Sequence, residues 1–143
     1  MSTIHATCVD IDGLGVLLRG PSGSGKSDLA LRLIDSGAQL VADDYTVVTL
    51  RGDRLIATAP QSIKGMLEVR GVGILPMPVK PRAVIAMVVD LITEGEIERL
   101  PDPDATIIDG ATVPRIQVAP FEVSAAAKVR LAARKYAPQD TET

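Results

Sequence analysis

The stretch Gly20-Pro-Ser-Gly-Ser-Gly-Lys-Ser27 is the segment from which the fold can be predicted. It matches the pattern G-x-x-x-x-G-K-S/T in full, in which glycines let backbone N–H groups turn toward an anion and the lysine reaches nucleotide phosphates. An apolar run at residues 15–19, which favours a strand, precedes it, and residues 27–36 follow with helical periodicity up to a suitable stop at Gly37. A strand, a glycine-rich loop and a helix in this order are the context that a phosphate-binding loop requires.

This loop is predicted to hold a nucleotide together with Mg²⁺. Its backbone amides and the positive end of the helix attract phosphate oxygens, and the Ser27 hydroxyl is a suitable Mg²⁺ ligand. The alternative is a chance glycine- and serine-rich loop with a surface lysine. The residues expected to bind the phosphates are Gly20, Pro21, Ser22, Gly23, Ser24, Gly25, Lys26 and Ser27.

An acidic pair lies shortly downstream, in Leu40-Val-Ala-Asp-Asp44. Only one helix and its return separate this segment from the loop, so we expect its strand to lie beside the strand that leads into the loop, with the acids near Lys26. Because neighbouring residues of a strand point to opposite faces, one acid of the pair is predicted to hold Mg²⁺ or a water of its shell, and the other to accept a proton from an attacking hydroxyl. Asp43 is our candidate Mg²⁺ ligand. Without the upstream loop, two solvated aspartates in a turn would be the simpler interpretation.

The composition excludes several other classes of protein. The 143 residues are 46% hydrophobic but include Trp 0, Tyr 2 and Phe 1, and the formal charge is −3, which argues against nucleic-acid binding. One histidine and one cysteine cannot build a zinc site. No apolar run is long enough to span a membrane, and the first residues do not resemble a signal peptide. We therefore expect one cytoplasmic domain over residues 1–143, with a polar tail from about 138.

The remaining segments favour strands over helices. Apolar alternation and turn residues predict two strands within residues 9–19 around a turn at Asp12-Gly13, a strand at 39–42 and a hairpin over 45–50 and 54–58. Farther along we expect a short helix at 62–65, an irregular glycine-rich segment ending in a brief strand, strands at 83–91 and 113–118, and a last helix over 122–136. The fold class is α/β, with a P-loop, a mixed β-sheet core and few helices.

Three segments follow one another in a characteristic order and spacing: the loop, the acidic pair and Leu67-Glu-Val-Arg-Gly-Val-Gly-Ile-Leu75, of which the last is the most specific. In this order and spacing the sequence resembles the catalytic domain of HPr kinase/phosphorylase. The resemblance implies a core similar to the nucleotide-binding part of phosphoenolpyruvate carboxykinase. It also implies ATP and Mg²⁺ as cofactors, transfer of phosphate to a serine of the phosphocarrier protein HPr, removal of that phosphate by phosphorolysis, and a homo-oligomer, typically a hexamer.

The resemblance also implies roles for single residues. His5, 21 residues before Lys26, matches an active-site histidine, and Lys26 contacts the transferring phosphate. Asp44 matches the residue that takes the serine proton, Glu68 a second Mg²⁺ ligand and Arg99 an active-site arginine. Their alternative interpretations are a surface histidine, a solvated loop acid, and an arginine that neutralises the glutamates beside it.

Two departures from the family pattern bear on activity. A Gly-Arg-Asn loop linked to dephosphorylation is replaced by Val118-Ala-Pro-Phe-Glu-Val-Ser-Ala125, so we expect a kinase with weak or absent phosphorylase activity. We also expect a short single-domain form, without the N-terminal domain of long members. Two other functions stay open, a small-molecule kinase and a nucleotide-sensing module without transfer. The basic face of the last helix either meets an acidic partner or complements its own helix dipole.

Overall fold

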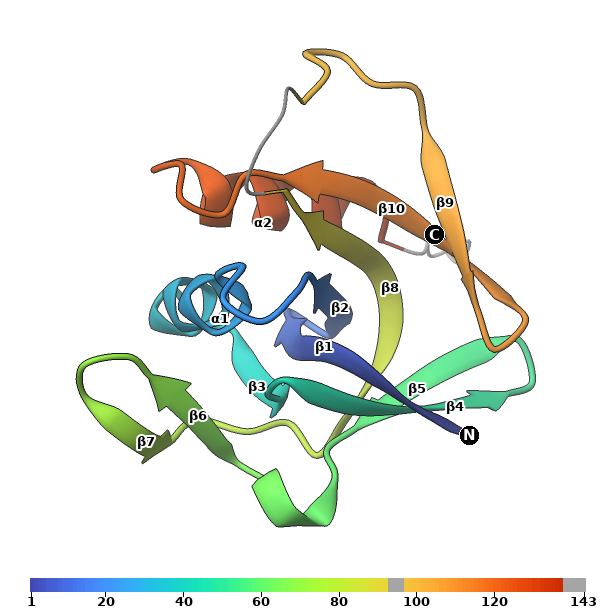
Figure 1. Ribbon diagram of the computed structural model, residues 1–143. Coiled ribbons are helices and arrows are strands. Elements are labelled where there is room, and N and C mark those ends of the chain that lie inside the picture. The colour runs from blue at the N-terminus through green and yellow to red at the C-terminus, as the bar shows by residue number, and fades with distance from the viewer. Residues whose placement is uncertain (93–96, 138–143) are drawn as a thin grey trace.

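The computed structural model describes residues 1–92 and 97–137. Its main body is an eight-stranded mixed sheet with strand order β2-β1-β4-β5-β8-β10-β9, to which β3 is added on β1 (Figure 1). The strands are β1 Ser2–Ile11, β2 Leu14–Arg19, β3 Gln39–Ala42, β4 Tyr45–Arg51, β5 Arg54–Thr58, β8 Arg82–Leu91, β9 Asp104–Ile108 and β10 Ala111–Val118. The helices are α1 Lys26–Asp35 and α2 Ala125–Lys135, with a 3₁₀ turn at Gln61–Ile63 and a separate hairpin of β6 Met66–Val69 and β7 Gly73–Pro76.

Two ten-residue strands, β1 and β8, hold the sheet together because each pairs with different neighbours along its length. The first part of β1 pairs with β4, and the remainder pairs with β2 on one side and β3 on the other. The start of β8 pairs with β5, and its later residues pair in parallel with both β2 and β10. The pairing thus closes a ring through β2, β1, β4, β5 and β8.

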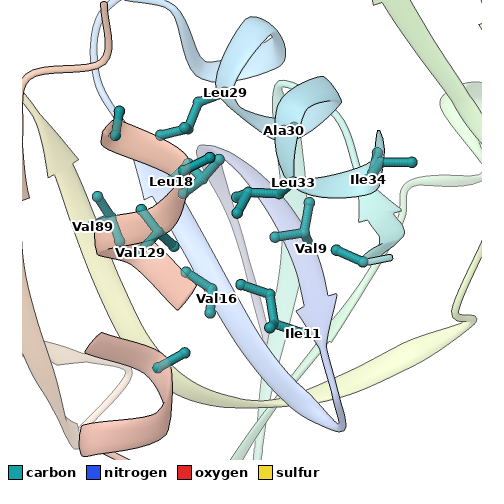
Figure 2. Close-up of a cluster of buried hydrophobic side chains, with 14 of the residues drawn as sticks. Val9, Ile11, Val16, Leu18, Leu29, Ala30, Leu33, Ile34, Val89 and Val129 are labelled. Carbon is teal, nitrogen blue, oxygen red and sulfur yellow. The ribbon is translucent and has the colours of Figure 1, made fainter. Parts of the chain in front are cut away.

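Both faces of the central strands are buried, which explains their nearly continuous apolar sequences. In β2, Val16 and Leu18 face the two helices, while Leu17 faces a second core that includes Val48 and Val88. Figure 2 shows the first core, where Leu29 and Leu33 of α1 and Val129 of α2 meet side chains of the sheet. Both helices therefore cover one face of the sheet.

The positions of β2 and β3 correct one prediction. We expected these strands to be neighbours, but β1 lies between them and runs antiparallel to both. The physical reason is that β1 is longer than the sequence pattern indicated. It forms a tight hairpin with β2 at Asp12 and Gly13, and its other edge remains available to β3. The return after α1 therefore passes over one intervening strand.

Other predicted elements agree with the structure, with small shifts at their ends. The hairpin of β4 and β5, the strand at residues 39–42 and both helices are confirmed. After residue 65 we expected an irregular segment and then one brief strand, but the structure has two paired strands, the β6–β7 hairpin. β9 was not predicted. No helix of the described residues is long and apolar enough to cross a membrane.

Leu33 tests the contribution of the helix-covered core. Leu33 is on α1, and its side chain is fully buried in the core between the two helices and the sheet. Leu33→Ala should therefore lower the free energy of unfolding by about 2–5 kcal/mol. The matched control is Leu131→Ala, because the Leu131 side chain is 61% exposed on α2. Urea unfolding followed by circular dichroism measures both changes. Equal effects of the two variants would show that the two helices do not depend on this core.

Candidate functional site

The predicted phosphate-binding loop connects β2 to α1. Gly25 is the residue that caps α1, and its φ of 99° is one that a residue with a side chain rarely adopts. No side chain caps this helix, and Leu29 N–H is the first to bond back into the loop, to the Gly25 carbonyl at 2.9 Å. The N–H groups of residues 26–28 have no partner within the described part of the chain and are left for a ligand, as an anion site at a helix start requires.

Lys26 is folded back onto its own loop. Its Nζ donates hydrogen bonds to the carbonyls of Gly20 at 2.8 Å and Pro21 at 3.1 Å, and its side chain is only 5% exposed. Burial lowers the pKa of Lys26, and the negative charges of Asp44 and Asp43 oppose that shift. The ammonium group thus stands beside two carboxylates at the start of the helix.

Asp43 joins three segments of the chain. Its Oδ1 accepts hydrogen bonds from Ser27 Oγ at 2.7 Å and from Thr7 Oγ1 at 3.0 Å, and its Oδ2 accepts one from the Glu68 N–H at 3.3 Å. Ser27 and Asp43, two of the three residues predicted to hold Mg²⁺, are therefore in direct contact. Thr7, which is fully buried in β1, was not predicted because a threonine in an apolar strand gives no signal of its own.

Asp44 adopts a left-handed backbone, with φ of 64°. Its N–H donates to Thr7 Oγ1 at 3.0 Å, and its Oδ1 lies 2.7 Å from His5 Nε2 and 4.0 Å from Lys26 Nζ. The His5 ring is stacked on Tyr45, with 5.3 Å between the ring centroids. We expected the two carboxylates to point to opposite faces. That expectation is wrong, because Asp44 leaves the strand conformation and both acids line one cavity.

The β6–β7 hairpin forms the opposite wall of this cavity of about 680 Å³. Residues 68–74 line it, together with the glycine-rich loop, both aspartates and Phe121. The hairpin is fixed at its base, where Met77 N–H donates to the Gly65 carbonyl and the following segment bonds to Leu40 on the free edge of β3. The hairpin therefore stands across the cavity from the phosphate loop.

The donors present fit a nucleotide bound with Mg²⁺. Mg²⁺ commonly takes one or two protein ligands and completes its shell with phosphates and water, which Asp43 and Ser27 satisfy. The Ser24 hydroxyl is buried in the loop with no hydrogen-bond partner among residues 1–92 and 97–137, and it is available to a ligand. Within those same residues no group of three or more acidic, histidine or cysteine side chains gathers as a metal site, and Glu68 contacts Asp43 through its backbone.

Two predicted residues lie farther from the loop. His5 does not line the cavity and reaches it through Asp44. Arg99 is in the exposed segment between β8 and β9 and is not part of the cavity wall, so its role remains a prediction.

The entry to the loop is held by an ion-pair cluster. Arg19, the last residue of β2, donates to both oxygens of Asp90 on β8, at 2.8 Å and 2.9 Å. Asp90 also accepts a hydrogen bond from Arg115 of β10, which bonds to Asp104 of β9 at 2.7 Å. Four adjacent strands are thus linked one residue before Gly20. Burial opposes ionisation of Asp90, but the hydrogen bonds and charges of Arg19 and Arg115 outweigh it and hold the pKa of that carboxyl below its usual value.

A mixed sheet that carries a phosphate loop at the end of β2, with both described helices on one face, defines a P-loop kinase-like fold. Comparison with known proteins gives the family. The model for the HPr Serine kinase C-terminal domain matches residues 1–137, and the chain belongs to that family. The solved structure of the Hpr(Ser) kinase/phosphatase from Coxiella burnetii superposes with a TM-score of 0.83 at 28% identity, over 94% of this chain and 95% of that one.

The curated relatives that the chain matches are named HPr kinase/phosphorylase. The chain is 38% identical over 128 residues to HPr kinase/phosphorylase of Limosilactobacillus reuteri (strain DSM 20016), which covers 81% of this chain. It is 38% identical over 130 residues to the corresponding protein of Chlorobium phaeobacteroides (strain DSM 266 / SMG 266 / 2430), which covers 82% of this chain. The matches span 40% of the length of each relative.

Asp90 gives a test based on pH. Since its pKa is lowered in the folded chain, its contribution to stability is complete above the pKa of an unfolded aspartate, about 3.9, and is lost as the pH falls through the lower folded value. Asp90→Asn should therefore lower the free energy of unfolding by about 2 kcal/mol at pH 7. The difference from the wild type should shrink below about pH 4.

Urea unfolding at a series of pH values measures this difference. Asp53→Asn, in the exposed turn between β4 and β5, is the control and should change little at any pH. A difference between wild type and Asp90→Asn that does not depend on pH would show that the ion pairs do not stabilise the fold.

Proposed function

We propose that this chain transfers the γ-phosphoryl group of ATP to a serine hydroxyl of an HPr-like phosphocarrier protein. The observation that carries the proposal is the position of Asp44 at the mouth of the phosphate loop, next to Lys26 and His5. A protein that only bound a nucleotide would need the loop but no proton acceptor beside it. Membership of the family and the matching segment at residues 67–75 support the same activity.

The chain's own residues divide the work of transfer. The free amides at the start of α1 orient the phosphates, and Lys26 must exchange its bonds to the loop carbonyls for bonds to phosphate oxygens. Asp43 and Ser27 would hold Mg²⁺, with Glu68 as a further ligand on the hairpin. When bound, Mg²⁺ would neutralise charge on the phosphates.

Asp44 is the proposed proton acceptor for the serine hydroxyl. About half of its side chain is exposed to the cavity, so a substrate can reach it. His5, in the tautomer with a proton on Nε2, donates to Asp44 Oδ1 and keeps the carboxylate oriented, while its stacking on Tyr45 fixes the ring. The β6–β7 hairpin would keep water from competing with the serine.

The reverse reaction is proposed to be weak or absent. Phosphorolysis needs a site for inorganic phosphate, and the stretch at residues 118–125 offers neither an arginine nor a glycine for it. The same proposal includes a homo-oligomer, hexameric by resemblance to the family. Size-exclusion chromatography with light scattering measures the assembly.

The basic residues of α2 were one candidate surface for binding the phosphocarrier. Of its basic residues, Lys128 pairs with Glu122 and Arg130 donates to Ser36 Oγ. These contacts give part of the basic face a role within the fold. The proposal therefore places recognition of the phosphocarrier at the cavity mouth, where the serine must enter, and not on α2.

The direct experiment is incubation with Mg·ATP and an HPr-like phosphocarrier from the same genome, followed by mass spectrometry for phosphoserine. Phosphoserine is the expected result, and later addition of inorganic phosphate should remove little of it. ATP binding without any phosphoserine would contradict transfer and favour a nucleotide sensor. Phosphorylation of a small molecule in place of the protein would favour the other kinase class.

Asp44→Asn separates binding from chemistry. Because the amide cannot accept the serine proton, the rate of transfer should fall by about 10²–10⁴-fold. Binding of Mg·ATP, measured by calorimetry, should change by only about threefold, since the phosphates are held by the loop and Lys26. Asp53→Asn is the control on the remote hairpin turn. Near-normal transfer by Asp44→Asn would overturn its role as the proton acceptor.

A further inference from the structure

The segment between β10 and α2 lies against the phosphate loop. Strands β2, β8 and β10 run parallel in neighbouring positions, so the chain leaves all three at the same edge of the sheet. The phosphate loop leaves β2 there, and residues 119–124 leave β10 there. Figure 1 shows this orange segment beside α1. Ligands of sheets with parallel strands bind outside this edge.

Phe121 of this segment rests directly on Gly25. A Cβ atom built on Gly25 would lie 3.2 Å from Phe121 Cε1 and Cζ and 3.2 Å from Pro120 Cβ, closer than side chains normally pack. Glycine at this position therefore serves the close approach of the ring as well as the turn of the loop. The ring is nevertheless 68% exposed, and it lines the same cavity as Lys26 and Ser27.

The backbone around Phe121 is held from α1. The Arg32 guanidinium donates hydrogen bonds to the carbonyls of Pro120 and Glu122, the residues on either side of Phe121. Arg32 also pairs with Asp28 in the first turn of α1, at 3.1 Å. The backbone that carries the ring is thus anchored to the helix whose N-terminus is the phosphate site, which places the ring beside that site.

We propose that Phe121 is the stacking platform for the purine base of the nucleotide. The proposal rests on the proposed binding of ATP and extends it to the base. An apolar ring that is held in place, exposed, and beside an anion-binding loop is complementary to a flat aromatic group joined to a polyphosphate. A purine offers the larger stacking area, and Leu31 on the same cavity wall adds apolar surface. Stacking contacts the face of the base and does not depend on its hydrogen-bonding groups, so ATP and GTP should bind with similar affinity.

The first experiment compares Mg·ATP with Mg·tripolyphosphate, which lacks base and ribose. In the full chain, Phe121→Leu should weaken binding of Mg·ATP by about tenfold and leave binding of Mg·tripolyphosphate unchanged. Phe121→Tyr should keep wild-type affinity because the ring remains. Val123→Ala is the matched control, since the Val123 side chain is fully exposed two residues along the same segment and does not line the cavity.

The second experiment uses the absence of tryptophan from the sequence. Phe121→Trp introduces a single fluorescent reporter whose emission should change on addition of Mg·ATP and not on addition of Mg·tripolyphosphate. Val123→Trp should respond to neither.

Each outcome decides the matter. The stacking role would be overturned if Phe121→Leu weakened binding of Mg·ATP and Mg·tripolyphosphate equally, or if the wild type bound the two with equal affinity. It would also be overturned if Phe121→Leu weakened binding of neither ligand, and that result would favour Phe121 as a contact for the protein partner. In all three cases the proposed nucleotide binding stands. Failure of the wild type to bind either ligand would refute the proposed function itself, and the stacking role with it.

Discussion

The buried carboxylate of Asp43 is the constraint on which the rest of the site depends. A charge with 8% exposure is tolerated only when its oxygens are hydrogen-bonded, and three donors from separate segments satisfy it. One donor is on β1, one is at the start of α1 and one is on the β6–β7 hairpin. The geometry of the cavity therefore follows from the need to satisfy a single acid. Binding of Mg²⁺ would exploit that arrangement, because Ser27 and Asp43 already meet.

The closed pairing of the sheet holds the donors to Asp43 in place. β1 carries Thr7 near its centre, is hydrogen-bonded on both edges and is buried on both faces over residues 6–11, so the hydroxyl that serves both aspartates cannot move far. The cluster around Asp90 acts in the same way at the end of β2. We expect these strands to keep their positions, and the hairpin and the loop to adjust, when a ligand binds.

The segment at residues 118–125 differs in chemistry from the corresponding segment of the family pattern. The family pattern has a Gly-Arg-Asn loop there, which suits an anion. This chain instead carries an apolar ring that lies against Gly25, on a backbone held by Arg32. An arginine in this segment would add positive charge to the cavity. A phenylalanine instead supplies surface for a flat apolar group, so the reaction partners that this end of the cavity stabilises are expected to differ.

The parts of this protein that depend on local geometry could be predicted from its amino-acid sequence. The glycines and lysine of the loop, the periodicity of α1 and its stop at Gly37, and the turn residues of the β4–β5 hairpin all act over a few neighbouring residues, and the structure confirms these elements. The fold class could also be predicted, because a phosphate loop between a strand and a helix has few alternatives.

Which distant residues meet could not be predicted in this way. The insertion of β1 between β2 and β3, the pairing of β9 with β10 and the approach of Phe121 to Gly25 depend on contacts between residues far apart in the chain, which local periodicity does not encode. The left-handed turn at Asp44 is of the same kind, since the Asp44 N–H is held there by a threonine 37 residues earlier. Hydrogen bonds that must be satisfied in a buried site, and not the propensity of single residues, set these positions.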